Sequence, residues 1–134
     1  MKVLTTARAR QTGTAEAARA VAALAALAQE TRLAIFRLLV EFAPTGLTPG
    51  AIALRLKLAP ATLSFHLKEL ASGGLITDRR DGRFIWYQAD LRAMSGLLGY
   101  LTEHCCQGTG GADCEPGCAP AACGPSSKRT RNKP

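Results

Sequence analysis

The sequence lacks a long apolar segment, and it lacks cysteine throughout its first 104 residues. No run approaches the ~18 consecutive apolar residues of a membrane span, and the alanine-rich stretch from Ala15 to Ala28 is interrupted by Arg19. No signal-peptide pattern follows Met1. We therefore expect no membrane segment, a cytoplasmic location, and no thiol chemistry in the body of the chain.

Acidic residues are scarce at both ends of the chain. Residues 1–20 contain only Glu16, and residues 124–134 contain none. The formal net charge of +7 and the sequence pI of about 9.6 favour a polyanionic partner. No acid/base pair typical of a catalytic site is recognisable, so we do not expect an enzyme.

We predict one folded domain with a tail on each side. The chain has 134 residues, of which 47% are hydrophobic, which is enough for a single core. Residues 1–13 have the composition of a flexible basic arm, and residues 14–106 that of the folded domain. Residues 107–134 are predicted to be a flexible tail, rich in Gly, Pro and Cys and basic at its end.

Residues 47–75 predict two short helices joined by a tight turn. Thr48 can cap the first helix, and Pro49 follows at its first position, where a missing N–H does no harm. Pro60 begins the second helix in the same way, but Ala59 before it is a poor cap. A short helix, a turn and a second helix form a helix-turn-helix, although an αα-hairpin in a helical core has the same pattern.

The second of these helices has an apolar side and a polar, basic side. Leucines at helical spacing predict the buried side: Leu63, Leu67 and Leu70. The opposite side presents Ala61, Ser64, Phe65, Lys68 and Ser72.

After Gly74 the pattern changes to strands. Asp81-Gly82 separates two runs that contain β-branched and aromatic residues, and Asp-Gly is a strong signal for a hairpin with a type I′ turn. Three arginines gather near the tip: Arg79, Arg80 and Arg83. An ordinary solvated turn can also carry them, but after a helix-turn-helix they predict phosphate contacts from the wing of a winged helix.

The fold class predicted is mainly α with a small β-hairpin, a winged helix-turn-helix. The helix before the helix-turn-helix has the apolar stripe Leu33, Phe36, Leu39 and Val40, and Asp90 can cap the final helix. The predicted helices span about 15–28, 30–43, 48–57, 60–72 and 90–105, and the predicted hairpin spans 75–89.

The first and last helices carry more apolar surface than so small a core needs. We therefore expect a homodimer in which these helices pair, because a two-fold dimer presents two recognition helices one DNA turn apart, about 34 Å. The expected interface consists of Val21, Leu24, Leu27, Met94, Leu97, Leu98 and Leu101.

Three segments follow one another along the chain: ALAQETRLAIFRLLV, TLSFHLKELASGGLI and RRDGRFIWY. In this order and spacing they resemble the ArsR/SmtB family of winged-helix metalloregulatory repressors. The resemblance covers about residues 22–106. It implies a homodimer that binds double-stranded operator DNA upstream of metal-resistance genes and leaves it when metal binds.

The resemblance also implies which residues contact DNA. Ser64 and His66 match the family's DNA-contacting serine and histidine, and Phe65 stands where the family usually has a basic or polar residue. Helical phasing puts Phe65 toward the groove, where it can contact a thymine methyl. His66 lies at the edge of the apolar stripe, so a packing role stays open for it. The expected DNA-binding residues are Pro60, Ala61, Thr62, Ser64, Phe65, His66, Lys68, Arg79, Arg80 and Arg83.

All five cysteines follow His104. The ending YLTEHCC resembles family members that sense trivalent arsenic with a vicinal cysteine pair after the last helix and a third cysteine downstream. The resemblance implies the ligands Cys105, Cys106 and Cys114, with Cys118 and Cys123 as possible substitutes. Trivalent arsenic and antimony are soft ions that select thiolates.

The vicinal pair can face one ion only if the helix ends beside it. Adjacent residues of a regular helix point about 100° apart, and the glycines that follow Gln107 permit an end there. A four-thiolate zinc site remains an alternative for this cluster. So does a role for Cys105 as a small buried hydrophobe.

The function predicted is a metal(loid)-responsive transcriptional repressor, released from its operator when trivalent arsenic or antimony binds the cysteine thiolates. One alternative keeps the DNA binding and makes the switch oxidative, through a disulfide among the clustered thiols. Another is a cysteine-tailed metal-binding or protein-interaction module, which would show no salt-sensitive binding to duplex DNA.

Overall fold

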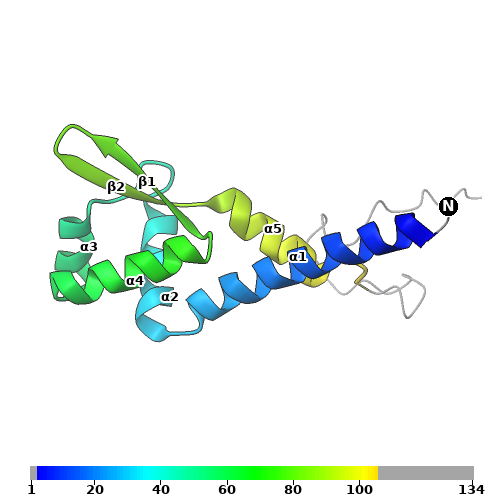
Figure 1. The fold of residues 1–134 in the computed structure, drawn as a ribbon. Helices are drawn as coiled ribbons and strands as arrows, with labels where there is room; N and C mark the ends of the chain where they lie inside the picture. The colour runs from blue at the N-terminus through cyan, green and yellow to red at the C-terminus, as the bar shows by residue number, and fades with distance from the viewer. Residues whose placement is uncertain (1–2, 106–134) are drawn as a thin grey trace, which may run out of the picture. The chain divides into compact units, whose positions relative to one another are not determined.

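The computed structural model describes residues 3–105 and contains five helices and one two-stranded hairpin within them (Figure 1). The chain divides after Met94 into two compact units. The first unit holds every element up to the first turn of the last helix, and the second unit begins within that helix. In chain order the elements are α1 (Val3–Leu27), α2 (Glu30–Glu41), α3 (Pro49–Leu56), α4 (Pro60–Ser72), β1 (Ile76–Asp81), β2 (Phe84–Ala89) and α5 (Leu91–Thr102).

The first helix is longer than the sequence predicted. α1 begins at Val3, twelve residues before the predicted start, so the arm expected at residues 1–13 is helical from Val3 on. Residues 3–12 contain no proline or glycine, and six of the ten have high helix propensity: Leu4, Ala7, Arg8, Ala9, Arg10 and Gln11. Gly13 is tolerated inside the helix because neighbouring good helix formers offset its cost of about 1 kcal/mol.

α1 meets the rest of the first unit through alanines. Ala20, Ala23 and Ala26 are buried, whereas Val21 is 65% exposed and Leu24 is 41% exposed. The small side chains allow α1 to pack closely against α4 and α2. The side of α1 that the larger apolar residues occupy is therefore not the side that faces the core of its own chain.

α2 begins at a cap and ends one residue before Phe42. The Gln29 side chain accepts a hydrogen bond from the Arg32 N–H at 2.8 Å. The predicted apolar stripe was partly wrong, because Leu33 and Val40 are each more than 40% exposed. The buried residues are Ile35, Phe36 and Leu39.

The second helix of the helix-turn-helix has the predicted bounds, and the first is one residue shorter at each end than the predicted 48–57. The Thr48 hydroxyl accepts a hydrogen bond from the Ala51 N–H at 3.3 Å, Pro49 begins α3, and Lys57 ends it with a left-handed φ of 54°. α4 begins at Pro60 with no side-chain cap from Ala59. The six largest fully buried side chains show that the core lies among α2, α3, α4 and Leu75, three residues after α4: Ile35, Leu39, Ile52, Leu63, Leu70 and Leu75.

The hairpin pairs in antiparallel register from Ile76 with Ala89 to Asp81 with Phe84. The two-residue loop is therefore Gly82-Arg83, and of its residues only Gly82 has a positive φ, 61°. This is the pattern of a type II′ turn, so the predicted type I′ turn centred on Asp81-Gly82 was wrong by one residue.

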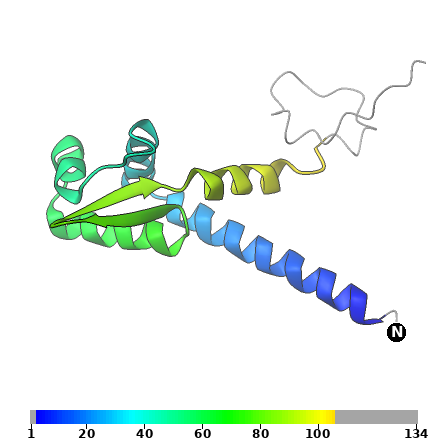
Figure 2. The same cartoon turned by 90° about the horizontal axis from the view of Figure 1, so that it is seen from above.

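A two-residue bridge ties the hairpin to the loop before α3. The Leu47 N–H donates to the Tyr87 carbonyl at 2.9 Å, and the Tyr87 N–H donates back to the Leu47 carbonyl at 2.8 Å. Gly46 allows this close approach, since its φ is +84° and a Cβ there would overlap the Tyr87 carbonyl oxygen. Viewed from above, the strands lie over the helices, with β1 against α4 and β2 against α2 and α3 (Figure 2).

α5 begins at the predicted cap and ends earlier than predicted. The Asp90 carboxylate accepts a hydrogen bond from the Ala93 N–H at 3.0 Å. The last helical residue is Thr102 rather than Cys105. Leu97 is buried, whereas Leu98 is 56% exposed and Leu101 is 52% exposed. Of the helices that the structure describes, none has the length and apolar character to cross a membrane.

Candidate nucleic-acid interface and thiol site

The outer side of α4 is open to solvent. Its exposed residues include all but one of the predicted α4 contacts: Pro60, Ala61, Thr62, Ser64, Phe65 and Lys68. Phe65 is the largest of them and is 57% exposed. The leucine stripe Leu63, Leu67 and Leu70 is buried on the opposite side, which confirms the predicted phasing of this helix.

His66 is the exception among the predicted α4 contacts, because its side chain is buried. Only 8% of its surface is exposed, because Leu63, His66, Leu67 and Leu70 together form the buried side of α4. Its Nδ1 atom is buried and has no hydrogen-bond partner among the described residues. The packing alternative for His66 is therefore favoured over a base or phosphate contact.

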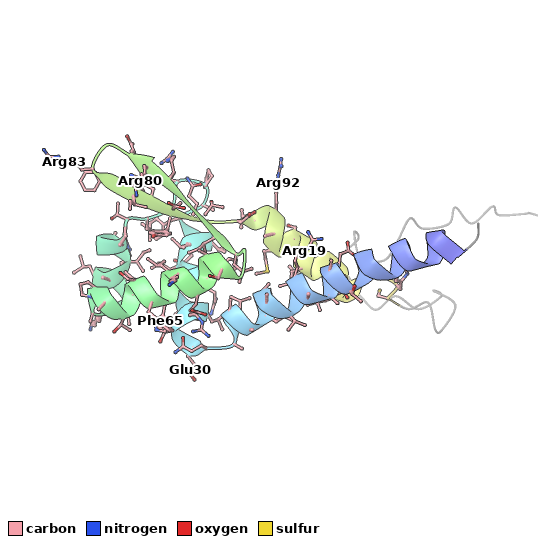
Figure 3. All side chains as sticks on the ribbon, in the orientation of Figure 1. Arg19, Glu30, Phe65, Arg80, Arg83 and Arg92 are labelled. Atoms are coloured by element: carbon pink, nitrogen blue, oxygen red, sulfur yellow. The ribbon has the colours of Figure 1, made fainter. Side chains whose placement is uncertain are left out.

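The three hairpin arginines are exposed, but they do not share one surface. Arg79 pairs with Trp86 and Arg80 pairs with Ile85, so the two arginines are consecutive on β1 and point to opposite faces of the hairpin. Arg83 lies in the turn. Figure 3 shows Arg80 on the hairpin and Arg83 at its end.

The cationic side chains of this region are not neutralised within the chain. Among residues 13–105, no acidic side chain forms a salt bridge with Lys68, Arg79, Arg80 or Arg83. Their charge is available to a polyanion, which is the electrostatic condition for duplex binding.

The predicted thiol site lies at the edge of the described residues. Cys105 is half-buried, and its N–H donates to the Thr102 carbonyl at 3.2 Å in a turn after α5. His104 has a left-handed φ of 62°, which takes the chain out of the helix before Cys105. The other four cysteines, Cys106, Cys114, Cys118 and Cys123, lie outside the described residues.

No cluster of three or more His, Cys, Asp or Glu that could hold a metal ion occurs within the part of the chain that the structure describes. A site at Cys105 with three or more such ligands would therefore need at least one ligand from outside the described residues.

Comparison with known proteins decides the family. A helix-turn-helix domain family matches residues 27–79. The transcriptional activator HlyU of Vibrio cholerae is 31% identical over 90 residues, which cover 67% of this chain and 81% of that protein. An ArsR-like transcriptional regulator from Rhodococcus sp. RHA1 is 28% identical, with a TM-score of 0.56 over 63% of this chain and 76% of its own. This chain belongs to the ArsR family of winged-helix transcriptional regulators.

Two further proteins are similar to this chain. The nodulation protein NolR of Rhizobium meliloti is 34% identical over 80 residues, and the match spans 60% of this chain and 63% of NolR. A winged helix-turn-helix DNA-binding domain from Mycobacterium bovis, described as homodimeric and possibly of the ArsR family, is 28% identical. Its TM-score is 0.53, over 69% of this chain and 81% of its own.

Membership settles the general class of this protein. The winged helix is a DNA-binding domain, the ArsR-family regulator acts in transcription, and it is not an enzyme. The fold predicted from the caps, the leucine stripe and the hairpin is confirmed.

One exposed aromatic residue of the hairpin was not among the predicted DNA contacts. Phe84 follows Arg83 at the tip of the hairpin and is 62% exposed. Its position directly after Asp-Gly-Arg was the available signal, since residues that flank a two-residue turn at the end of a hairpin have few neighbours to cover them.

Proposed function

We propose that this ArsR-family regulator is a homodimeric repressor released from its operator by trivalent arsenic or antimony. The proposed ligands are Cys105, Cys106 and a third thiolate from Cys114, for which Cys118 or Cys123 can substitute. The observation that carries the proposal is the end of α5 at Thr102. Cys105 follows the end of the regular helix, so the ~100° divergence that a helix imposes on successive residues does not govern this position.

The DNA-binding part of the proposal rests on exposure and charge. The outer side of α4 enters the major groove, and hairpin arginines contact phosphates. His66 is buried and is not among the residues proposed to contact DNA. If the protein neutralises six to ten phosphates, its affinity for the duplex should fall by a factor of about 10³–10⁵ as the salt concentration rises from 50 to 200 mM.

The dimer proposed uses the apolar residues that the single chain leaves exposed. These are Val21 and Leu24 on α1 and Leu98 and Leu101 on α5. Covering them would remove large apolar side chains from water, which is favourable at roughly 25 cal/mol per Å². A related domain is described as homodimeric, which supports the proposal.

Inducer binding and DNA binding are coupled through the same protein. A coupling free energy of roughly 1–3 kcal/mol would weaken operator binding about 5- to 150-fold. Linkage makes the coupling reciprocal, so the operator must weaken arsenite binding by the same factor.

The test is operator release in the presence of a reductant. A duplex selected by the protein from a random pool is titrated with arsenite, antimonite, methylarsenite, cadmium and zinc. We expect release by the trivalent arsenicals and antimonite, and none from the Cys105→Ser, Cys106→Ser double variant. The Cys118→Ser variant is the matched control and should still respond. Arsenite release that persists in the double variant would refute the thiolate assignment, and release by peroxide alone would favour the oxidative switch.

A further inference from the structure

We propose that Phe65 recognises the 5-methyl group of thymine, so that operator sequence is read on α4 largely through apolar contact. This inference rests on the proposed DNA binding and adds the chemistry by which bases are distinguished. Phe65 is 57% exposed and lies on the side of α4 opposite the buried leucines. Figure 3 labels it on this helix.

The exposed side of α4 has few groups that can read bases by hydrogen bonds. Bidentate readout of guanine uses Arg or Lys, and bidentate readout of adenine uses Asn or Gln. The sequence of α4 contains no Arg, Asn or Gln, so Lys68 is the one side chain of this kind on the helix. Ser64 and Thr62 offer hydroxyls, which bond to several bases and discriminate weakly.

Phe65 is the largest apolar side chain exposed on α4. Ala61 lies one turn before Phe65 on the same side of the helix. Both are exposed. Ala and Phe side chains contact the thymine methyl, which is the apolar group on the major-groove edge of the base pairs. The ring of Phe65 stands edge-on to His66, with 5.7 Å between the ring centroids and 63° between the planes, so a buried side chain supports it.

The exposed lysine beside the ring favours DNA over an apolar protein partner. Lys68 lies one turn after Phe65 and is exposed. Within the described chain it has no salt-bridge partner, and neither do the hairpin arginines. An apolar protein surface placed on the ring would have to desolvate Lys68 without pairing it. A duplex instead offers phosphates to the lysine and a methyl group to the ring.

The experiment compares DNA with and without the 5-methyl groups of thymine. The full-length protein, reduced and without inducer, selects a duplex from a random pool. That duplex is then made with thymine or with uracil, which differs from thymine only in the missing 5-methyl. We expect the wild type to bind the thymine duplex about fourfold more tightly for each methyl group that it covers.

Two variants of matched chemistry assign the discrimination to one residue. Phe65→Ala should bind the thymine duplex roughly tenfold more weakly and lose most of the preference for thymine over uracil. Phe84→Ala removes a ring of similar exposure, 62% against 57%, and should keep that preference. The comparison is a double-mutant cycle between a side chain and a methyl group.

The outcomes separate this inference from the proposed function. Equal wild-type binding to both duplexes, or a full preference in Phe65→Ala, would overturn methyl recognition while DNA binding stands. Selection of no duplex with salt-sensitive affinity would overturn the DNA-binding proposal itself, and the inference with it.

Discussion

Gly73 at the end of α4 lies directly against Ala26 of α1. A Cβ atom on Gly73 would stand 2.7 Å from the Ala26 Cβ and 3.2 Å from the Ala22 carbonyl oxygen. The φ of Gly73 is −75°, which any residue adopts. The glycine is therefore required by the closeness of the two helices and not by its backbone conformation.

Gly73→Ala should lower the free energy of unfolding by about 1–3 kcal/mol, because the added methyl group overpacks this contact. Urea denaturation measures the loss. Ala26→Gly opens space at the same point, so the double variant should be less destabilised than the sum of the two single variants. Additive effects of the two substitutions on the free energy of unfolding would contradict a direct contact between Gly73 and Ala26.

Ala59→Ser should stabilise the protein by up to about 1 kcal/mol. Ala59 has an extended backbone and no side-chain hydrogen bond to the first turn of α4, and a serine there can accept one. The reverse change at an existing cap, Thr48→Ala, should destabilise by a similar amount. Denaturant midpoints test both, and a destabilised Ala59→Ser would show that the cap position is blocked.

His66→Leu should leave DNA affinity within about twofold of wild type and change stability by less than about 1 kcal/mol. The substitution keeps an apolar residue on the buried side of α4 and removes an Nδ1 atom that has no partner among the described residues. Ser64→Ala, at an exposed position, is the comparison and should weaken DNA binding. A large loss of DNA affinity in a folded His66→Leu variant would instead support a direct contact between His66 and DNA.

Arg83→Ala should reduce the slope of log affinity against log salt by about 0.9, the value for one phosphate contact. Of Arg79→Ala and Arg80→Ala, only one should do the same, because these side chains lie on opposite faces of β1. Arg19→Ala on α1 provides the control for lost charge. Equal reductions from both strand arginines would mean that the hairpin is contacted on two faces.

Val21→Glu should convert the proposed dimer to a 14.1 kDa monomer at micromolar concentration, since it places a charge in an apolar interface. Sedimentation measures the mass, and circular dichroism verifies that the helices remain. Leu54→Glu, at a position that is 81% exposed on α3, should leave the mass unchanged. A Val21→Glu protein that stays dimeric would move the interface away from α1.

Local signals in the sequence were sufficient for the helix-turn-helix. Thr48-Pro49 and Pro60 are start signals that act within one turn, and α3 and α4 begin where they predict. Phasing by leucines likewise predicted the exposure of Phe65, because a regular helix converts spacing directly into direction.

Features that depend on a neighbouring element were not predictable in the same way. In α1 the residues buried within the chain are Ala20, Ala23 and Ala26, because a close helix contact selects small side chains, and the sequence alone did not specify which alanines they would be. The turn of the hairpin shifted by one residue because pairing of Asp81 with Phe84 sets the loop, and Asp-Gly alone does not fix that register.

Two hydrogen bonds of Asp90 connect the start of α5 with the residue Leu75 after α4. The Asp90 carboxylate holds the Ala93 N–H, while the Asp90 N–H donates to the carbonyl of Leu75 at 2.8 Å. Leu75 follows α4 by only three residues. Any rotation of the first turn of α5 must therefore break one of these bonds or carry the end of α4 with it. Asp90 therefore joins the first turn of α5 to the segment that follows α4 within the first unit.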